Sequence, residues 1–234
     1  MNTQPVSSSR ERRQGFLTWV VNGLRWRLEA YLARSRRSFW HLSRRILGVR
    51  ETGWANVVMD RETEEFVRSL NCSSWHALEI SGTRWQDFGF ASYRNVSFPE
   101  YDICEGPLEQ EAFDIVIAEQ VLEHVLWPYR AVRNVWKMLR PGGVFVATTP
   151  FLIPVYDCPV DCSRWTELGL KHLLAEGGFE LGNIITASWG NSSCVRADLR
   201  LRGLKFSYWV PWKHSLRNEP YCPVVVWAFA RKAD

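Results

Sequence analysis

The fold class is decided by one stretch, FDIVIAEQVLEHVLWPYRAVRNVWKMLRPGGVFVATTPF, which spans residues 113–151. Its first part, Phe113–Ala118, is a short apolar run with β-branched side chains, which is typical of a buried strand. Helical spacing of apolar residues follows from Tyr129 to Leu139, and Arg140-Pro141-Gly142-Gly143 signals a helix end and a turn. Val144–Thr149 is a second buried-strand pattern. The stretch therefore predicts strand, helix and strand, with a further short helical pattern at Val121–His124.

The same patterns extend outward on both sides of this stretch. Apolar spacing predicts helices at Arg61–Leu70 and Thr166–Glu176. Short apolar runs predict four more strands, at His76–Ile80, Arg94–Phe98, Ile184–Ser188 and Val224–Arg231. Strands that alternate with helices pack into a mostly parallel sheet covered on both faces. The sequence thus predicts an α/β, doubly wound architecture.

Charge divides the chain into two parts. The 234 residues are 46% hydrophobic and carry a formal net charge of +4. Residues 1–50 hold eleven arginines and two glutamates, a charge of +9, so the remaining residues carry 4 − 9 = −5. This composition excludes collagen-like, low-complexity and wholly disordered classes. We expect a basic arm at 1–50 and one globular domain at 51–234.

Residues 16–47 of the basic arm show amphipathic helical spacing, with three tryptophans and flanking arginines. Three interpretations stay open. The helix can dock on the body of its own chain, it can lie on an anionic membrane surface, or it can bind nucleic acid, which is the least favoured of the three. No apolar run reaches the ~18–20 residues of a membrane-spanning helix. No secretory signal is evident and the six cysteines are scattered, so we expect a cytoplasmic protein, with membrane association as an option.

The strand ends indicate where a ligand would bind. In open α/β sheets, ligands bind outside the carboxyl ends of the strands. The segments that follow the predicted strands are 81–84, 97–105, 119–124 and 150–164. Candidate functional residues are therefore sought in these four segments.

Three motifs within residues 113–151 stand at a distinctive spacing: Phe113-Asp114, Leu122-Glu123-His124 and Leu139-Arg140-Pro141-Gly142-Gly143. Together with Asp161-Cys162-Ser163-Arg164-Trp165-Thr166 and Gly177-Gly178-Phe179, they resemble class I S-adenosylmethionine-dependent methyltransferases, in particular the type 11-like subgroup. The resemblance covers roughly residues 76–188. It implies a Rossmann-like fold, S-adenosyl-L-methionine as cofactor, and methyl transfer.

The resemblance also implies a set of cofactor-binding residues. Relatives follow an acidic residue after the first strand with three alternating glycines, which let backbone approach a ligand. Here Ser81, Thr83 and Trp85 stand in those three places and Gly82 is the glycine that is left. Carried over by position, the set runs along three strand ends: Glu79, Ser81, Gly82 and Thr83 after the first, Asp102 for the adenine, and Glu119 and Gln120 for the methionine end.

After the second predicted strand, the acids that would contact the ribose and the adenine have alternatives. Relatives bind the ribose hydroxyls with an acid near the position of Ser97, so that acid is either Glu100, displaced, or absent. Glu105 is the alternative to Asp102 as the adenine contact. Each of these carboxylates can instead be a solvated turn residue.

On the acceptor side, the candidate catalytic residues are Asp161, His124 and Tyr156, with Asp157 and Arg164 beside them. A base is needed only where the methyl acceptor is a hydroxyl or another protonated group. Asp161 and Arg164 can instead form an ion pair that orders the loop, and His124 can be a structural residue bonded to backbone. Cys158 and Cys162 lack metal-site spacing, so we expect no metal.

The segment 189–221 is basic and rich in aromatic residues, and reads as an insertion between the last two strands. Such a composition suits an anionic, sugar-bearing or lipid-linked acceptor, although its tryptophans can also simply pack on the sheet. The sequence therefore predicts a methyltransferase for a small-molecule or glycan/lipid-linked acceptor, and favours methylation at oxygen. The alternatives are a non-catalytic methyltransferase-like binding module and an RNA methyltransferase. The oligomeric state is left open.

Overall fold

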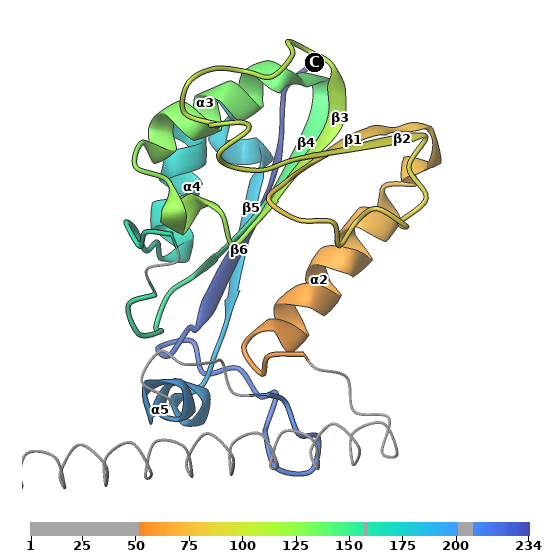
Figure 1. The fold of residues 1–234 in the computed structure, drawn as a ribbon. Coiled ribbons are helices and arrows are strands. Elements are labelled where there is room, and N and C mark those ends of the chain that lie inside the picture. The colour runs from red at the N-terminus through yellow and green to blue at the C-terminus, as the bar shows by residue number, and fades with distance from the viewer. Residues whose placement is uncertain (1–51, 157–158, 201–207) are drawn as a thin grey trace, which may run out of the picture. The chain divides into compact units, whose positions relative to one another are not determined.

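The computed structural model describes residues 52–156, 159–200 and 208–234 (Figure 1). The basic arm, including the helical pattern at 16–47, lies outside the described residues, as do Asp157 and Cys158. A six-stranded sheet has the order β2-β1-β3-β4-β6-β5. Its strands are β1 (His76–Ile80), β2 (Ser92–Val96), β3 (Phe113–Glu119), β4 (Leu139–Pro150), β5 (Ile184–Trp189) and β6 (Val225–Arg231).

The sheet is parallel on one side and mixed on the other. β1 pairs in parallel with β2 and β3, and β3 pairs in parallel with β4. β6 lies antiparallel between β4 and β5, so β5 runs in the same direction as β4. This arrangement confirms the predicted α/β fold with a mostly parallel sheet. The carboxyl ends of β1, β2, β3 and β4 consequently lie along one edge.

Helices cover both faces of the sheet (Figure 1). α3 (Pro128–Met138) and α4 (Glu167–Glu176) pack on one face, and α2 (Asn56–Ser69) packs on the other. Alternate residues of the central strands divide between these layers: Val116 and Phe145 join the cluster with α3 and α4, whereas Ile115 and Val144 join the cluster with α2. Burial on both faces explains why these strands read as continuous apolar runs.

The connection from β1 to β2 contains no helix, in agreement with the turn that the sequence places after the first strand. Residues 81–91 are all described and contain turns but no helix. Trp85, which is 1% exposed, fills the space against the sheet, and its ring lies 4.8 Å from that of Phe88, which stacks in turn on Phe90 at 5.6 Å. An aromatic cluster thus covers the sheet face in place of a crossover helix. Because this loop is short, the position of its side chains is set by packing on α2 and β1.

Several element boundaries differ from the predictions. The helix predicted at Arg61–Leu70 begins at Asn56, and the strand predicted at Arg94–Phe98 is Ser92–Val96. The helical pattern at Val121–His124 is a single 3-10 turn, η2 (Leu122–His124). By contrast, the strand at His76–Ile80 has the predicted bounds.

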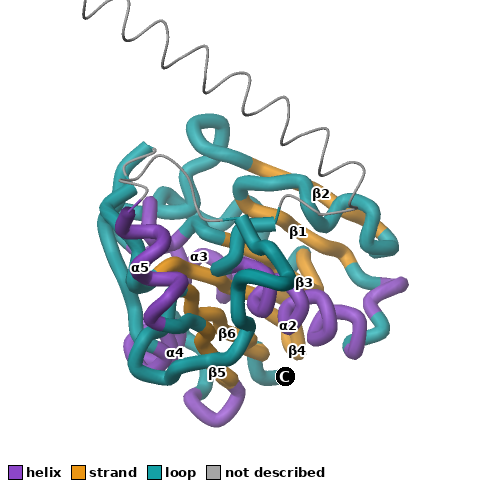
Figure 2. Tube along the Cα trace, turned by 90° about the horizontal axis from the view of Figure 1, so that it is seen from below, coloured by secondary structure: helices purple, strands orange, loops and turns teal. Residues whose placement is uncertain are grey.

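The segment 189–221 begins with α5 (Ser192–Arg200) and returns beside the start of that helix (Figure 2). Three indole N–H groups hold the returning chain: Trp54 donates to the carbonyl of Ser215, Trp189 to that of Leu216, and Trp209 to that of His214, at 3.0–3.2 Å. Buried Trp54 and Trp189 belong to one apolar cluster, and Trp209 packs against it. Trp189 and Trp209 of this segment, together with Trp54, therefore serve packing and anchoring, whereas Trp212 is exposed.

Among the described residues, none of the helices is long and apolar enough to cross a bilayer.

Gly190 tests the packing of this returning segment. A Cβ at Gly190 would lie 2.1 Å from the carbonyl oxygen of Cys222 and 2.4 Å from the amide nitrogen of Val224, and backbone atoms cannot rotate away. We expect Gly190→Ala to lower the free energy of unfolding in urea by about 1–3 kcal/mol or more. Gly182→Ala is the control, because a Cβ there meets nothing within 4 Å, and should change stability by less than about 0.5 kcal/mol. Equal effects of the two substitutions would contradict the packing described for Gly190.

Candidate functional site

Two non-glycine residues adopt left-handed backbone conformations at neighbouring strand ends. Ser81, directly after β1, has φ of 64°, and Gln120, directly after β3, has φ of 54°. Hydrogen bonds fix both: the Ser81 amide donates to the Val96 carbonyl at 2.8 Å, and the Gln120 amide donates to the Thr148 carbonyl at 3.0 Å. Strained backbone of this kind concentrates at functional sites. It marks the edge between β1 and β3 as the candidate site.

Glu79 organises the loop after β1. Its side chain is buried, and its carboxylate accepts hydrogen bonds from the backbone amides of Arg84 and Trp85, both at 3.0 Å, and from the Tyr93 hydroxyl at 2.6 Å. Burial and the neighbouring carboxylate raise the pKa of Tyr93 far above its usual range, so this hydroxyl stays a donor. Glu79 therefore lies beneath the loop, with its oxygens turned to the loop's own backbone.

Gly82 is required by that arrangement. A Cβ at Gly82 would lie 2.5 Å from Oε1 of Glu79, so a larger residue would displace the carboxylate. Thr83 follows as an exposed loop residue. The structure thus gives Gly82 a packing role toward Glu79, whereas the sequence suggested a close approach to a ligand.

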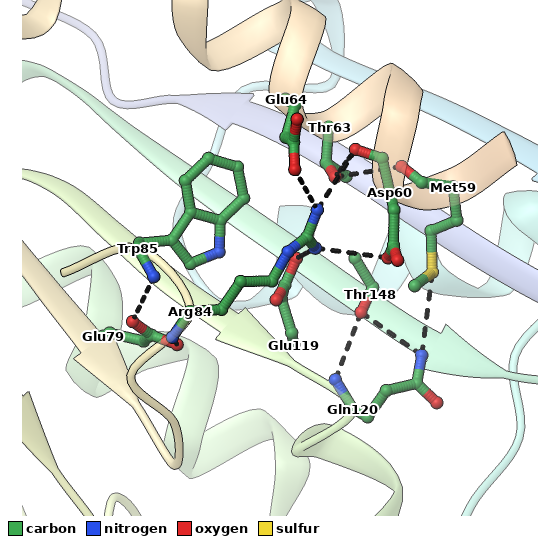
Figure 3. Close-up of polar contacts among 10 residues, drawn as sticks. All are labelled: Met59, Asp60, Thr63, Glu64, Glu79, Arg84, Trp85, Glu119, Gln120 and Thr148. Atoms are coloured by element: carbon green, nitrogen blue, oxygen red, sulfur yellow. Dashed lines mark hydrogen bonds and ion pairs between the residues drawn. The ribbon is translucent and has the colours of Figure 1, made fainter. Parts of the chain in front are cut away.

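Arg84 is a site residue that sequence reasoning missed. Its guanidinium reaches three carboxylates (Figure 3): Nη1 lies 2.6 Å from Oε1 of Glu119 and 3.2 Å from Oδ1 of Asp60, and Nη2 lies 2.9 Å from Oε1 of Glu64. Nη2 also donates to the carbonyl of Asp60 at 3.3 Å. The side chain thereby connects the loop after β1 with α2 and with the end of β3. The sequence signal was an arginine inside the substituted glycine loop.

The carboxylates around Arg84 differ in their proton affinity. Burial raises the pKa of Glu119 to about 7, against the opposing effect of the Arg84 guanidinium. Burial also raises the pKa of Asp60, and Arg84 again opposes it. Three acids facing one guanidinium leave an excess of negative charge when all are ionised. A group of this kind can accept a cationic ligand group and can titrate near neutral pH.

Gln120 is held by its amide nitrogen. Nε2 donates to Oγ1 of Thr148 at 3.2 Å and lies 3.7 Å from the Met59 sulfur (Figure 3). No hydrogen bond to the side-chain oxygen of Gln120 occurs within the described part of the chain. That oxygen is thus an oriented acceptor beside Glu119.

The loop after β2 places Asp102 on a fixed turn. Its Oδ1 accepts a hydrogen bond from the amide of Cys104 at 2.8 Å, and the side chain of Asn134 holds the next part of the loop by donating to the Ile103 carbonyl at 2.8 Å. The alternatives Glu100 and Glu105 are exposed, whereas Asp102 is half-buried. A carboxylate fixed in this way keeps further acceptor capacity for a ligand.

The three catalytic candidates of the acceptor side come together. The rings of His124 and Tyr156 lie 5.2 Å apart, and Asp161 accepts a hydrogen bond from the Tyr156 amide at 2.7 Å. Asp161 also forms an ion pair with Arg164, which together with the Tyr156 amide lowers the pKa of Asp161. His124 bonds through Nδ1 to the carbonyl of Val160. Asp161 is accordingly an anchor of this loop and a weak proton acceptor.

Glu123 is the second site residue that sequence reasoning missed. It is fully buried, and neither carboxylate oxygen has a hydrogen-bond partner in the described structure. Burial raises its pKa to about 8, so the neutral acid is the main form at pH 7. Its Oε1 lies 3.7 Å from Nε2 of His124, and its backbone carbonyl accepts a hydrogen bond from the Cys162 amide at 2.7 Å. The Leu122-Glu123-His124 motif thus holds the acceptor-side loop through two hydrogen bonds, one from the His124 ring to the Val160 carbonyl and one from the Cys162 amide to the Glu123 carbonyl.

Within residues 52–156, 159–200 and 208–234, no group of three or more His, Cys, Asp or Glu side chains is arranged so that it could hold a metal ion. The cofactor candidates Glu79, Ser81, Gly82 and Thr83 share one loop, Glu119 and Gln120 share the neighbouring strand end, and Asp102 stands on the loop after β2.

Comparison with known proteins gives a family for part of the chain. Residues 66–147, from α2 to β4, match the family described as "Methyltransferase domain". A "Probable S-adenosylmethionine-dependent methyltransferase" of Mycolicibacterium smegmatis is 35% identical over 97 residues, which are 39% of this chain and 38% of that protein. A protein of the same description from Mycobacterium tuberculosis is 32% identical over 93 residues, 37% of this chain and 34% of that protein. The chain thus spans less than two fifths of the length of the curated relatives it matches.

Solved structures are similar over a longer part of the chain. An S-adenosylmethionine-dependent methyltransferase of Mesorhizobium loti has a TM-score of 0.45 and 15% identity, covering 72% of this chain and 96% of that one. An S-adenosylmethionine-dependent methyltransferase of Archaeoglobus fulgidus has a TM-score of 0.47 and 12% identity, covering 74% of this chain and 94% of that one.

Strain at Ser81 can be measured through stability. Ser81→Gly should raise the free energy of unfolding by about 0.5–1 kcal/mol, because glycine adopts a positive φ without steric cost. Ser81→Val should lower it by about 1–2 kcal/mol, since a β-branched side chain is strained there. Ser81 is exposed, so neither change alters core packing. Urea titration of both variants checks the order, and a valine variant as stable as the glycine variant would contradict it.

Proposed function

We propose that this chain, whose residues 66–147 match the family described as "Methyltransferase domain", is a class I S-adenosylmethionine-dependent methyltransferase that binds S-adenosyl-L-methionine and transfers its methyl group to an oxygen of an acceptor. The observation that carries the proposal is the match of residues 66–147, which contain the strained ends of β1 and β3. Supporting it, the polar residues of those two ends face one edge of a parallel sheet, where ligands of such sheets bind.

The residues at these strand ends fit the cofactor. The backbone at Ser81–Thr83 forms the turn, and Asp102 offers a fixed carboxylate for an amino group of the adenine. Glu119 and Gln120 offer acceptor oxygens for the methionine end. Gly82 and Glu79 keep the turn in shape from below. The cofactor, when bound, supplies a methyl group already activated on a sulfonium, so these residues bind and orient it.

On the acceptor side, the chain's residues position a nucleophile and receive its proton. Asp161 is committed to Arg164 and has a lowered pKa, so we assign it to holding the loop and orienting the acceptor. His124 is committed through Nδ1, which leaves Nε2 as the nitrogen that can take a proton. Tyr156 contacts His124 and lines the same side. A hydroxyl acceptor, which must lose a proton on methylation, fits this set.

A non-catalytic binding module is the second candidate. Ser81, Thr83 and Trp85 occupy the places of the three glycines, and Trp85 is buried under the loop. A loop reshaped in this way can retain the fold without binding the cofactor. Calorimetric titration with S-adenosylhomocysteine separates the two functions.

The first test compares two acids in that titration. We expect the unaltered protein to bind S-adenosylhomocysteine, and absence of binding at millimolar ligand would support the non-catalytic module. Asp102→Ala removes a charge-assisted bond worth roughly 1.5–3 kcal/mol, so affinity should fall by about ten- to a hundredfold. Asp161→Ala should leave this affinity within a few-fold and reduce turnover instead. The reverse pattern would show that the two ends of the site are assigned the wrong way round.

In this proposal the acceptor belongs to the small-molecule or glycan/lipid-linked class. The protein is cytoplasmic, and residues 16–47 make peripheral contact with a membrane. Two observations support contact with lipid. Trp212 and Tyr221, in the segment that three indoles anchor, are 73% and 96% exposed, and Val155 on the acceptor-side loop is 80% exposed. Cationic and aromatic residues together suit an anionic bilayer surface. All five described cysteines are free, as a reduced compartment favours.

The membrane contact is tested with two matched double variants of the full chain. Arg44→Gln with Arg45→Gln should weaken binding to phosphatidylglycerol-containing vesicles by about tenfold or more, since each basic residue near such a surface contributes about 1 kcal/mol. The control is Arg61→Gln with Arg94→Gln, which removes the same charge from exposed sites on the body. Vesicle co-sedimentation measures both. An equal loss in the two variants would indicate a general charge effect and would refute contact through the arm.

A further inference from the structure

Five apolar or aromatic side chains are exposed around the proposed acceptor side. Leu126 and Trp127, in the turn before α3, are 67% and 55% exposed, and Val155, on the loop after β4, is 80% exposed. Tyr156 and Val160 of the same loop are exposed as well. We call these five residues the apolar rim. Exposed apolar side chains that stand together, unlike scattered ones, mark a contact surface.

The two segments of the apolar rim meet at His124. The His124 ring bonds through Nδ1 to the Val160 carbonyl, and it lies 5.2 Å from the Tyr156 ring. The next residue along the chain, Val125, is buried, whereas the two residues after it are exposed. The apolar rim is therefore gathered on either side of one anchored residue, and its side chains are left without cover by the described part of the chain.

The helix that follows the turn, α3, carries only positive charge. Arg130, Arg133 and Lys137 are exposed and stand at positions i, i+3 and i+7, which places them along one face of the helix. The helix has no acidic residue, although residues 51–234 are acidic overall. The Arg130 guanidinium lies over the ring of Trp127, 4.9 Å from its centroid. Positive charge thus begins where the apolar rim ends.

This combination fits the surface of an anionic bilayer. Tryptophan and tyrosine favour the level of the lipid head groups, aliphatic side chains reach the apolar layer below, and neighbouring arginines and lysines attract anionic lipid. A bilayer offers an apolar layer and negative charge side by side over its whole area. A protein partner would have to offer both in one matching shape.

We propose that the apolar rim inserts into the interface of an anionic lipid bilayer while the cationic face of α3 contacts the head groups. This surface lies on the folded body, and so it goes beyond the proposed contact through residues 16–47. The inference rests on the proposed function in one respect, its orientation. It turns the proposed acceptor side, with His124 and Tyr156, toward the bilayer, where a lipid-linked acceptor is presented.

Hydrogen exchange of the full chain locates the contact. With phosphatidylglycerol-containing vesicles, we expect the amides of 125–130 and 152–156 to exchange about threefold more slowly or less. The amides of 181–186 should be unchanged. They lie where β5 begins, and β5 runs in the same direction as β4, so this is the edge opposite to the carboxyl ends of β1 to β4. Phosphatidylcholine vesicles, which lack net charge, should give less protection.

Leu126→Gln with Val155→Gln should weaken binding to the phosphatidylglycerol-containing vesicles by about tenfold or more, because the bilayer then covers less apolar area. The matched control is Leu181→Gln with Ile185→Gln, which alters residues 48% and 63% exposed at the opposite edge and should stay within about twofold. Vesicle co-sedimentation of the full chain measures both. Neither pair includes a residue proposed for catalysis or cofactor binding.

Arg130→Gln with Arg133→Gln tests the charge of α3. Binding to phosphatidylglycerol-containing vesicles should fall by about tenfold, and binding to phosphatidylcholine vesicles should stay within about twofold. The control is again Arg61→Gln with Arg94→Gln, which removes the same charge from other exposed sites on the body. An equal loss in the two variants would contradict contact through this helix.

The outcomes separate this inference from the proposed function. Vesicle binding without protection of 125–130 and 152–156, or an equal effect of the rim variant and its control, overturns the inference. Protection that rises with protein concentration in the absence of vesicles also overturns it, and assigns the surface to a second copy of the chain. Protection by vesicles in a chain that does not bind S-adenosylhomocysteine retains the inference and refutes the proposed function. Where the rim variant does not fold, hydrogen exchange of the unaltered chain still decides.

Discussion

The buried carboxylate of Glu79 is the interaction on which the site depends. A charged group is costly to bury unless hydrogen bonds compensate it, and Glu79 receives two from loop amides and one from the Tyr93 hydroxyl. These bonds tie the loop after β1 to both β1 and β2. The loop conformation and the pairing of β1 with β2 consequently stabilise each other, because Tyr93 belongs to β2.

Three features follow from that constraint. Gly82 lies so close to Glu79 that a Cβ at this position would displace the carboxylate from its hydrogen bonds. Trp85 turns inward and closes the core under the loop. Arg84, between them, extends its side chain away from Glu79 toward α2 and β3. The substituted glycine loop is therefore an ordered structure in which side-chain bonds set the backbone.

Apolar patterns predicted the sheet well, since strands buried on both faces must be apolar throughout. His76–Ile80 and the core of Phe113–Glu119 show this clearly. The start of α2 was missed because Asn56–Asp60 precedes the acidic stretch used to place the helix, and packing of Met59 and Val58 against the body stabilises it. The conformation of the connection between β1 and β2 was not predictable from propensity either. Residues 81–91 depend on Glu79 and on aromatic packing, which are contacts between elements.

The sequence indicated which residues lie at the candidate site better than what each of their side chains does there. Strand ends converge on one edge, which pointed to the segments 119–124 and 150–164, and the family resemblance then named Glu119 and Gln120 within the first of them. The roles depend on which oxygen or nitrogen is already bonded, and this is a property of the folded chain. The Arg164 guanidinium lowers the pKa of Asp161, and burial raises the pKa of Glu123. Neither Arg84 nor Glu123 carried a periodic signal, because each acts through partners distant in sequence.

The exit of β3 joins the two halves of the site. Arg84 and Thr148 hold Glu119 and Gln120, which we propose for the cofactor, whereas Glu123 and His124, only a few residues later, hold the loop that we propose for the acceptor. Because Gln120 has a left-handed backbone and η2 follows directly, the chain between the halves has little freedom. The proposed in-line methyl transfer requires the two ligands to be held in a fixed relative position, and residues 119–124 are the short segment that connects the side chains we propose for each ligand.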